Sequence, residues 1–148
     1  MSIKSLTINF PLICLWESYN FISMTLSDSV KSCLSKYATF QGRAPRSEYW
    51  WFVLFANLFV FFICIAFAAI GYVFGGVPGM SLAFVIGYGL SILMLFLPQL
   101  AVFVRRLHDT NHSGWWYFIS LIPFGVFYLL ILLLTDSDDE NKYGLPIY

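Results

Sequence analysis

Charged side chains are scarce in this chain. Only 11% of its 148 residues are Asp, Glu, Lys or Arg, whereas an ordinary soluble domain carries about 25%. A water-facing surface cannot be built from so few charges, and 59% of the residues are apolar and 20% aromatic. Intrinsic disorder is excluded as well, because disordered chains are rich in charge and poor in aromatic residues. The composition therefore predicts a membrane protein.

An excess of positive charge is also missing. Eight Lys and Arg residues balance eight Asp and Glu residues, so no net charge is available to neutralise phosphates and we expect no nucleic-acid partner. The three cysteines, Cys14, Cys33 and Cys64, form no CxxC pair. This spacing predicts neither a disulfide framework nor a zinc site, and nothing in it points to a cofactor.

The hydrophobic runs predict three membrane crossings. No charged residue occurs in the 56 positions between Glu48 and Arg105. A hydrocarbon core of roughly 30 Å takes about 20 helical residues, so this gap fits two spans. The segment Gly75–Gly79 contains three glycines and Pro78 and predicts the turn between them. The three predicted spans are Tyr49–Tyr72, Ser81–Val104 and Trp115–Leu134.

The segment before the first span predicts an amphipathic helix over Thr25–Thr39. Thr25 and Asp28 have the spacing of a capping box at its start. We expect this helix to lie in the membrane interface, and the alternative is a helix that packs on a partner protein. Met24 directly precedes it, so we interpret residues 1–23 as an extension upstream of the natural start. The predicted fold is thus an all-α membrane protein, divided into 1–23, 24–48, 49–134 and 135–148.

The distribution of Lys and Arg predicts the orientation. Five lie before the first span, two in the second connection and one in the acidic tail after the third span. The positive-inside rule places the N-terminus and the second connection in the cytoplasm. Three crossings then place the C-terminal tail on the opposite, periplasmic side.

Three polar segments flank the predicted spans. They are Phe40–Trp51, Arg105–Trp116 and Asn141–Gly144. Together they resemble the bacterial inner-membrane family catalogued as domain of unknown function 805, with its patterns F-x-G-R-x-x-R-x-E-Y-W, R-R-L-H-D-x-x-x-S-G-W-W and N-R-Y-G. Lys142 stands where that family usually has Arg. The resemblance covers about Met24 to Gly144 and implies a multi-pass protein of the bacterial inner membrane, and it implies no activity.

The ionisable residues of the first two segments form the main candidate site, here called the Arg-rich rim. Asp109 lies four residues after Arg105 and three after Arg106, so these side chains share a face if the second helix extends that far. The rim can fix the topology and join helix ends, bind anionic lipid headgroups or ligands, or contact a partner protein. Its members are Arg43, Arg46, Glu48, Arg105, Arg106, His108 and Asp109.

Catalytic and metal-binding patterns are weak. His108 and His112 have the i, i+4 spacing of a helical metal site, but Thr110–Gly114 reads as a loop that breaks it. Ser113 has no neighbouring base and is expected to cap the third helix. We therefore predict no metal site, no catalytic residue and no enzymatic activity.

Two polar residues lie inside the predicted spans. Asn57 and Gln99 fall at similar depths and can meet across the first two helices. No charged residue lies in any span, and ion coupling usually requires one. We therefore expect an integral inner-membrane protein that is non-enzymatic and acts as an interaction, accessory or lipid-associated protein. The expected partners are membrane lipids, anionic headgroups included, a protein, or further copies of the chain. The alternative function is a small homo-oligomeric transporter or channel.

Overall fold

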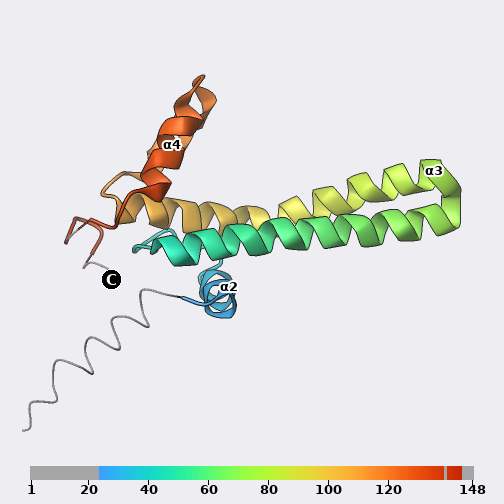
Figure 1. Cartoon of the computed structure of the whole chain (residues 1–148), viewed down its shortest axis with the longest axis horizontal. Helices are drawn as coiled ribbons and strands as arrows, with labels where there is room; N and C mark the ends of the chain where they lie inside the picture. The colour runs from blue at the N-terminus through green and yellow to red at the C-terminus, as the bar shows by residue number, and fades with distance from the viewer. Residues whose placement is uncertain (1–23, 139, 145–148) are drawn as a thin grey trace, which may run out of the picture.

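The computed structural model describes residues 24–138 and 140–144, and all regular elements within these residues are helical. The all-α class is therefore confirmed. Figure 1 shows one very long hairpin, with a short helix beside it and a further helical unit at its open end. The elements are α2 (Leu26–Ser35), α3 (Arg46–Asp109), the 3-10 helix η1 (Gly114–Leu121) and α4 (Gly125–Leu134). The extension over residues 1–23 lies outside the described residues.

Helix α3 is two helices joined at a sharp bend. Gly76 adopts φ 60° and ψ −147° inside its 64 residues, a conformation that only glycine adopts without strain. The bend lies in the predicted turn and divides α3 into a first arm, residues 46–75, and a second arm, residues 77–109 (Figure 1). At 1.5 Å per residue each arm is about 45–50 Å long, which exceeds a hydrocarbon core of roughly 30 Å.

Small residues bring the two arms together near this bend. A Cβ atom added to Gly71 would lie 2.4 Å from the carbonyl oxygen of Gly79 and 2.5 Å from the Cβ of Ala83. A Cβ added to Gly87 would lie 2.8 Å from the ring of Phe67. The backbones can approach this closely only because these positions carry no side chain.

Helix α3 has the length and apolar character of a membrane-crossing helix, and it is the one such helix among the described residues. Only 11% of its most apolar stretch is buried within the protein. Phe74 and Val73, next to the bend, are 86% and 77% exposed. A soluble protein would bury such side chains in its core, so the surface of the hairpin suits a lipid environment.

Helix α2 begins at the predicted position. The Thr25 side chain caps it by accepting a hydrogen bond of 3.3 Å from the Asp28 backbone N–H. The helix ends at Ser35, so it is shorter than the predicted Thr25–Thr39. Ser29 and Cys33 are fully buried on its inner face, where α2 packs against α3.

A proline in the second arm supplies an anchor for the segment that follows α2. Pro98 has no backbone N–H, so the carbonyl of Met94, four residues earlier, has no helical donor. The Tyr37 hydroxyl donates a hydrogen bond of 2.5 Å to this carbonyl oxygen. The hydrogen bond that Pro98 removes from the helix is therefore replaced by a tertiary hydrogen bond from Tyr37.

The predicted third span over Trp115–Leu134 needs correction. The segment forms the eight-residue η1 and the ten-residue α4, separated at Pro123 and at Phe124, which has φ 67°. The two pieces pack on each other, with the Trp116 and Tyr128 ring centroids 5.6 Å apart. A ten-residue helix is about 15 Å long, half of a hydrocarbon core. The η1–α4 unit therefore leaves the open end of the hairpin and returns to it (Figure 1).

The position of the C-terminal tail also needs correction. The prediction places it at the opposite side from the Arg-rich rim, but the structure packs it on that rim. The backbone N–H of Asp138 donates to the carbonyl of Asp109 at 3.1 Å, and the Asn141 amide donates to the carbonyl of His108 at 3.0 Å. The physical reason is the return of α4: η1 and α4 leave the open end of the hairpin and come back to it, so the tail begins beside the rim.

Candidate functional site

The open end of the hairpin contains a buried ionic cluster centred on Asp109. One oxygen of its carboxylate accepts a hydrogen bond of 2.8 Å from Arg43 Nε, and the other accepts from Arg106 and from the Ser137 hydroxyl. The side chains of Arg43, Arg106 and Asp109 are at most 1% exposed. Arg43 comes from the segment before α3 and the other two from its last turn, so the cluster joins both ends of the hairpin.

This cluster holds one positive charge more than it holds negative charge, and backbone carbonyls compensate it. Arg106 donates to the carbonyls of Leu133 and Thr135 at the C-terminal end of α4, where the helix dipole concentrates negative charge. Arg43 donates to the tail carbonyls of Asp138 and Gly144. Burial lowers the pKa of Arg106, and the charge of Asp109 opposes that shift. The arginines thus fix the end of α4 and the tail.

A second buried pair lies beside the first cluster. Glu48, in the first turn of α3, accepts a hydrogen bond of 2.9 Å from Arg105 Nη1 in the last turns. The same carboxylate oxygen accepts from the Ser32 hydroxyl at 3.0 Å and from the Cys33 thiol at 3.6 Å. Glu48 is 2% exposed and Arg105 1%. The pair therefore joins α2 to both arms of α3.

Burial also makes the Cys33 thiol a weak acid. Its pKa is raised from 9.0 to about 12, mainly by desolvation and also by the negative charge of Glu48, against the opposing charge of Arg105. The thiolate is the reactive form of cysteine. Cys33 is therefore an inert part of the packing between α2 and α3.

One ion pair of the rim lies at the surface instead. Arg46 pairs with Asp136, and the two side chains are 38% and 94% exposed. Arg46 also donates a hydrogen bond of 2.8 Å to the carbonyl of Thr135. Exposed ion pairs contribute little to stability. The Arg46–Asp136 pair therefore lies at the outer surface of the polar end and adds little to its stability.

His108 joins the tail to the hairpin through its ring. The imidazole stacks on the Tyr143 ring with centroids 3.9 Å apart and planes within 5° of parallel. Desolvation lowers the pKa of His108 from 6.5, and the nearby positive charge of Lys142 lowers it further, whereas a hydrogen bond with the Gly42 carbonyl raises it. The neutral ring is therefore the form that this site favours.

All seven residues of the Arg-rich rim lie at this one end, and five of them are buried. The two that stay partly accessible are Arg46 and His108. The guanidinium groups of Arg43 and Arg106 make their hydrogen bonds within the protein, and Arg105 leaves only its Nε without a partner. This arrangement suits the interpretation of the rim as a staple between helix ends.

The sequence prediction missed the residues that complete these clusters. They come from α2 and from the tail, and they are Ser32, Cys33, Thr135, Ser137 and Tyr143. The tail motif Asn141–Gly144 was the available sign that the tail packs on another segment, since the polar groups of such a motif need hydrogen-bond partners. Its placement required knowing that α4 returns.

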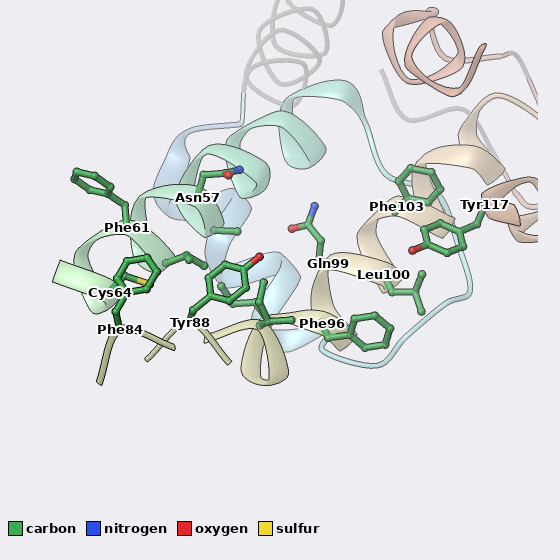
Figure 2. A pocket seen from close by; sticks show the side chains of 14 residues that line it. Asn57, Phe61, Cys64, Phe84, Tyr88, Phe96, Gln99, Leu100, Phe103 and Tyr117 are labelled. Carbon is green, nitrogen blue, oxygen red and sulfur yellow. The ribbon is translucent and has the colours of Figure 1, made fainter. Parts of the chain in front are cut away.

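The predicted polar pair inside the spans does not hydrogen-bond. The Asn57 amide donates to the Val53 carbonyl of its own helix at 2.8 Å, and the buried Gln99 Oε1 has no partner. Both side chains instead line one cavity between the two arms and η1, with a volume of about 620 Å³ (Figure 2). The two residues predicted to pair therefore belong to a pocket.

Among the described residues, no group of three His, Cys, Asp or Glu side chains is placed to hold a metal ion. His112 Nδ1 lies 2.5 Å from the Thr110 carbonyl oxygen, and its ring packs against Trp116. Ser113 caps η1 as predicted by accepting from the Trp115 backbone N–H at 3.5 Å. These residues shape the loop between α3 and η1.

Comparison with known proteins identifies the family. The profile described as "Protein of unknown function (DUF805)" matches residues 37–145. The chain belongs to this family. It is similar to the Escherichia coli inner membrane protein YhaH, with 37% identity over 114 residues that cover 75% of this chain and 88% of YhaH. It is also similar to the E. coli inner membrane protein YhaI, with 36% identity over 115 residues that cover 76% and 89% of the two chains.

No solved structure matches the chain. The matched residues 37–145 include both arms of α3, the η1–α4 unit and the tail motif. The predicted resemblance is thus confirmed, and the family, the relatives and the apolar α3 agree on an integral protein of the inner membrane.

Proposed function

We propose that this protein is a non-enzymatic, lipid-associated accessory protein of the inner membrane. One observation carries the proposal: the ionisable side chains of the family motifs are bound to one another and to carbonyls, while the exposed surface of the hairpin is apolar. Ionisable side chains that are paired in this way stabilise the fold. What remains available to another molecule is the apolar surface and the cavity between the arms.

In this proposal the two arms of α3 cross the bilayer and the η1–α4 unit enters it from one side. Arg43, Arg105 and Arg106 then lie together at one membrane face, with Lys31 on the neighbouring α2, Lys36 directly after α2 and Lys142 in the tail. By the positive-inside rule this face is cytoplasmic. The first and the last described residues of the chain, 24 and 144, then lie on the cytoplasmic side.

Contact with anionic headgroups falls to different residues in the folded protein than the sequence suggested. Arg105 and Arg106 are buried, whereas Lys31 on α2 and Lys36 directly after it are exposed. A short helix with one exposed lysine on it and another at its C-terminal end, at the cytoplasmic face, suits a position in the membrane interface. We therefore assign any headgroup contact to α2 and its C-terminal end.

Native mass spectrometry of the protein, extracted gently from its own membrane, tests this function. We expect a stoichiometric lipid or other lipophilic molecule that stays bound. Replacing Lys31 and Lys36 by Gln is expected to reduce retention of phosphatidylglycerol and to leave phosphatidylethanolamine unchanged. A protein that carries nothing, with identical spectra for both forms, contradicts the proposal.

The alternative is a small homo-oligomeric transporter or channel. It is supported by the cavity, because Asn57 and Gln99 place polar groups between apolar arms. A bare oligomer of several copies in the same spectra, together with solute flux in liposomes, would favour it over the accessory role.

A further inference from the structure

The cavity between the arms has the size of a small-molecule site. Its volume of about 620 Å³ falls in the range of roughly 300–1,000 Å³ that is typical of ligand pockets. The first arm contributes Asn57 and Cys64, the second contributes Tyr88 and Gln99, and η1 contributes Tyr117. Because three separate segments build its walls, the cavity is a product of the tertiary fold.

Polar groups in this cavity lack partners within the described chain. Gln99 Oε1 is buried without a hydrogen bond, and the hydroxyls of Tyr88 and Tyr117, whose side chains are 51% and 39% exposed at the open side of the cavity, make none within the described chain. Figure 2 shows the Gln99 amide and both hydroxyls directed toward the middle of the pocket. At the level of the hydrocarbon core no bulk water is available to satisfy such groups, so each one is unfavourable without a partner. A bound molecule with its own polar atoms would supply that partner.

The rest of the lining restricts what that molecule can be. None of the described residues that line the cavity is charged, and none is a histidine. An ion or a charged headgroup would meet no counter-charge there and would lose its hydration. Aromatic rings make up much of the wall, and they favour a flat partner by stacking. These rings are Phe61, Phe84, Tyr88, Phe96, Phe103 and Tyr117.

We propose that the cavity binds one uncharged lipophilic molecule whose flat ring carries carbonyl or hydroxyl oxygens, the chemistry of a membrane quinone or quinol. The hydroxyls of Tyr88 and Tyr117 and the Gln99 NH₂ donate to the ring oxygens, and Gln99 Oε1 accepts from a ring hydroxyl. The apolar tail leaves along the arms toward the lipid. This inference rests on the proposed function, since it names the molecule with which the accessory protein associates.

Binding is tested with two matched probes on the full chain in detergent. Decylubiquinol, kept reduced during the measurement, has two ring hydroxyls and a ten-carbon tail, and decylbenzene has the same tail on a ring without oxygens. Native mass spectrometry counts the bound molecules over a concentration series. We expect one decylubiquinol per chain and at least about tenfold weaker binding of decylbenzene, because the latter satisfies none of the polar groups.

Three variants assign the binding to the cavity. Gln99→Leu and Tyr88→Phe remove polar groups from its wall, and each is expected to weaken decylubiquinol binding by about tenfold. Tyr128→Phe is the matched control, because this tyrosine packs on Trp116 outside the cavity. Gln99→Leu introduces an apolar residue into an apolar helix, and an unfolding temperature without probe that is equal to or above that of the wild type confirms that it folds.

Two results would overturn the inference. The first is equal binding of both probes with no effect of Gln99→Leu, which would make the cavity a general groove for lipid chains. The second is a dimer in the wild type that Gln99→Leu dissociates, which would assign the polar groups to a second copy. If endogenous lipids are retained while neither probe binds, the quinone inference fails and the proposed lipid association stands.

Discussion

The two ends of the long hairpin differ in which side chains they bury and which they expose. At the open end, charged residues are buried: Asp109 and Arg106 are both 0% exposed. At the bend, large apolar residues are exposed, and Phe74 is 86% exposed. In a soluble protein both arrangements would be inverted. The exposed apolar side chains at the bend suit a lipid environment, whereas internal contacts compensate the buried charges at the open end.

This difference explains why the sequence motifs cluster where they do. The bend needs only small residues that permit close approach, such as Gly71 and Gly79. The open end has to join four segments, namely α2, both ends of α3 and the tail, and each buried charge needs partners from another segment. Its residue types are therefore tightly constrained, whereas the exposed surface of the arms needs only to be apolar.

The largest expected effect concerns the side of the membrane on which the tail lies. Fusions to residue 148 with green fluorescent protein, which fluoresces in the cytoplasm, and with alkaline phosphatase, which is active in the periplasm, give opposite results for the two topologies. Because the tail packs on the rim residues Arg43 and His108, we expect fluorescence without phosphatase activity. The reverse pattern would restore a third crossing and separate the tail from the rim.

Removing the central carboxylate is expected to have the largest effect on stability. Asp109→Ala leaves Arg43 and Arg106 buried without a counter-charge, and we expect a loss of about 5 kcal/mol or failure to fold. Asp136→Ala is the control, since this residue pairs with Arg46 at the surface and its loss should cost less than about 1 kcal/mol. Unfolding in mixed micelles of increasing dodecyl sulfate content measures both. Similar losses would mean that the buried cluster contributes no more than a surface pair.

A smaller effect is expected at the Glu48–Arg105 pair. Glu48→Gln keeps the shape and leaves Arg105 buried without its counter-charge, so we expect a loss of about 3 kcal/mol. The same change removes the negative charge that helps to raise the pKa of Cys33. Labelling with a maleimide at pH 8 should therefore be slow in the wild type and faster in Glu48→Gln. Cys33→Ser provides the background from the other cysteines, and an unchanged labelling rate would place Cys33 away from the carboxylate.

The sequence predicts the long hairpin well because its determinants are local. The apolar runs set the arms, and the segment around Gly76 and Pro78 sets the bend. The capping residues Thr25 and Ser113 also depend only on their neighbours. Local chemistry of this kind can be read without knowledge of the fold.

The return of α4 could not be predicted in the same way. The largely apolar 20-residue segment Trp115–Leu134 has the length of a span, and Pro123 is compatible with a kinked helix that continues. The deciding contacts are tertiary: Arg106 binds the end of α4, and Gly125 allows the chain to pass against the backbone of Ile119. The same return places the tail on the rim and turns candidate headgroup ligands into buried partners. The similar depths of Asn57 and Gln99 in the two arms could be predicted from the sequence. The cavity that separates the arms and that both residues line could not.

The smallest expected effect is a pH dependence of the contact between tail and rim. Burial and Lys142 lower the pKa of His108 in the folded state, so the unfolded chain binds the proton more readily. The contribution of His108 is therefore fully present above about pH 6.5 and decreases as the pH falls from there toward the lower folded pKa. Unfolding of the wild type and of His108→Phe, measured at pH 7.5 and pH 5.5, isolates the effect, because phenylalanine keeps a ring against Tyr143 and does not titrate. An equal loss of stability in both proteins at pH 5.5 would show that the stack of His108 on Tyr143 does not respond to protonation. The open end of the hairpin would then differ from the bend only in the side chains that it buries.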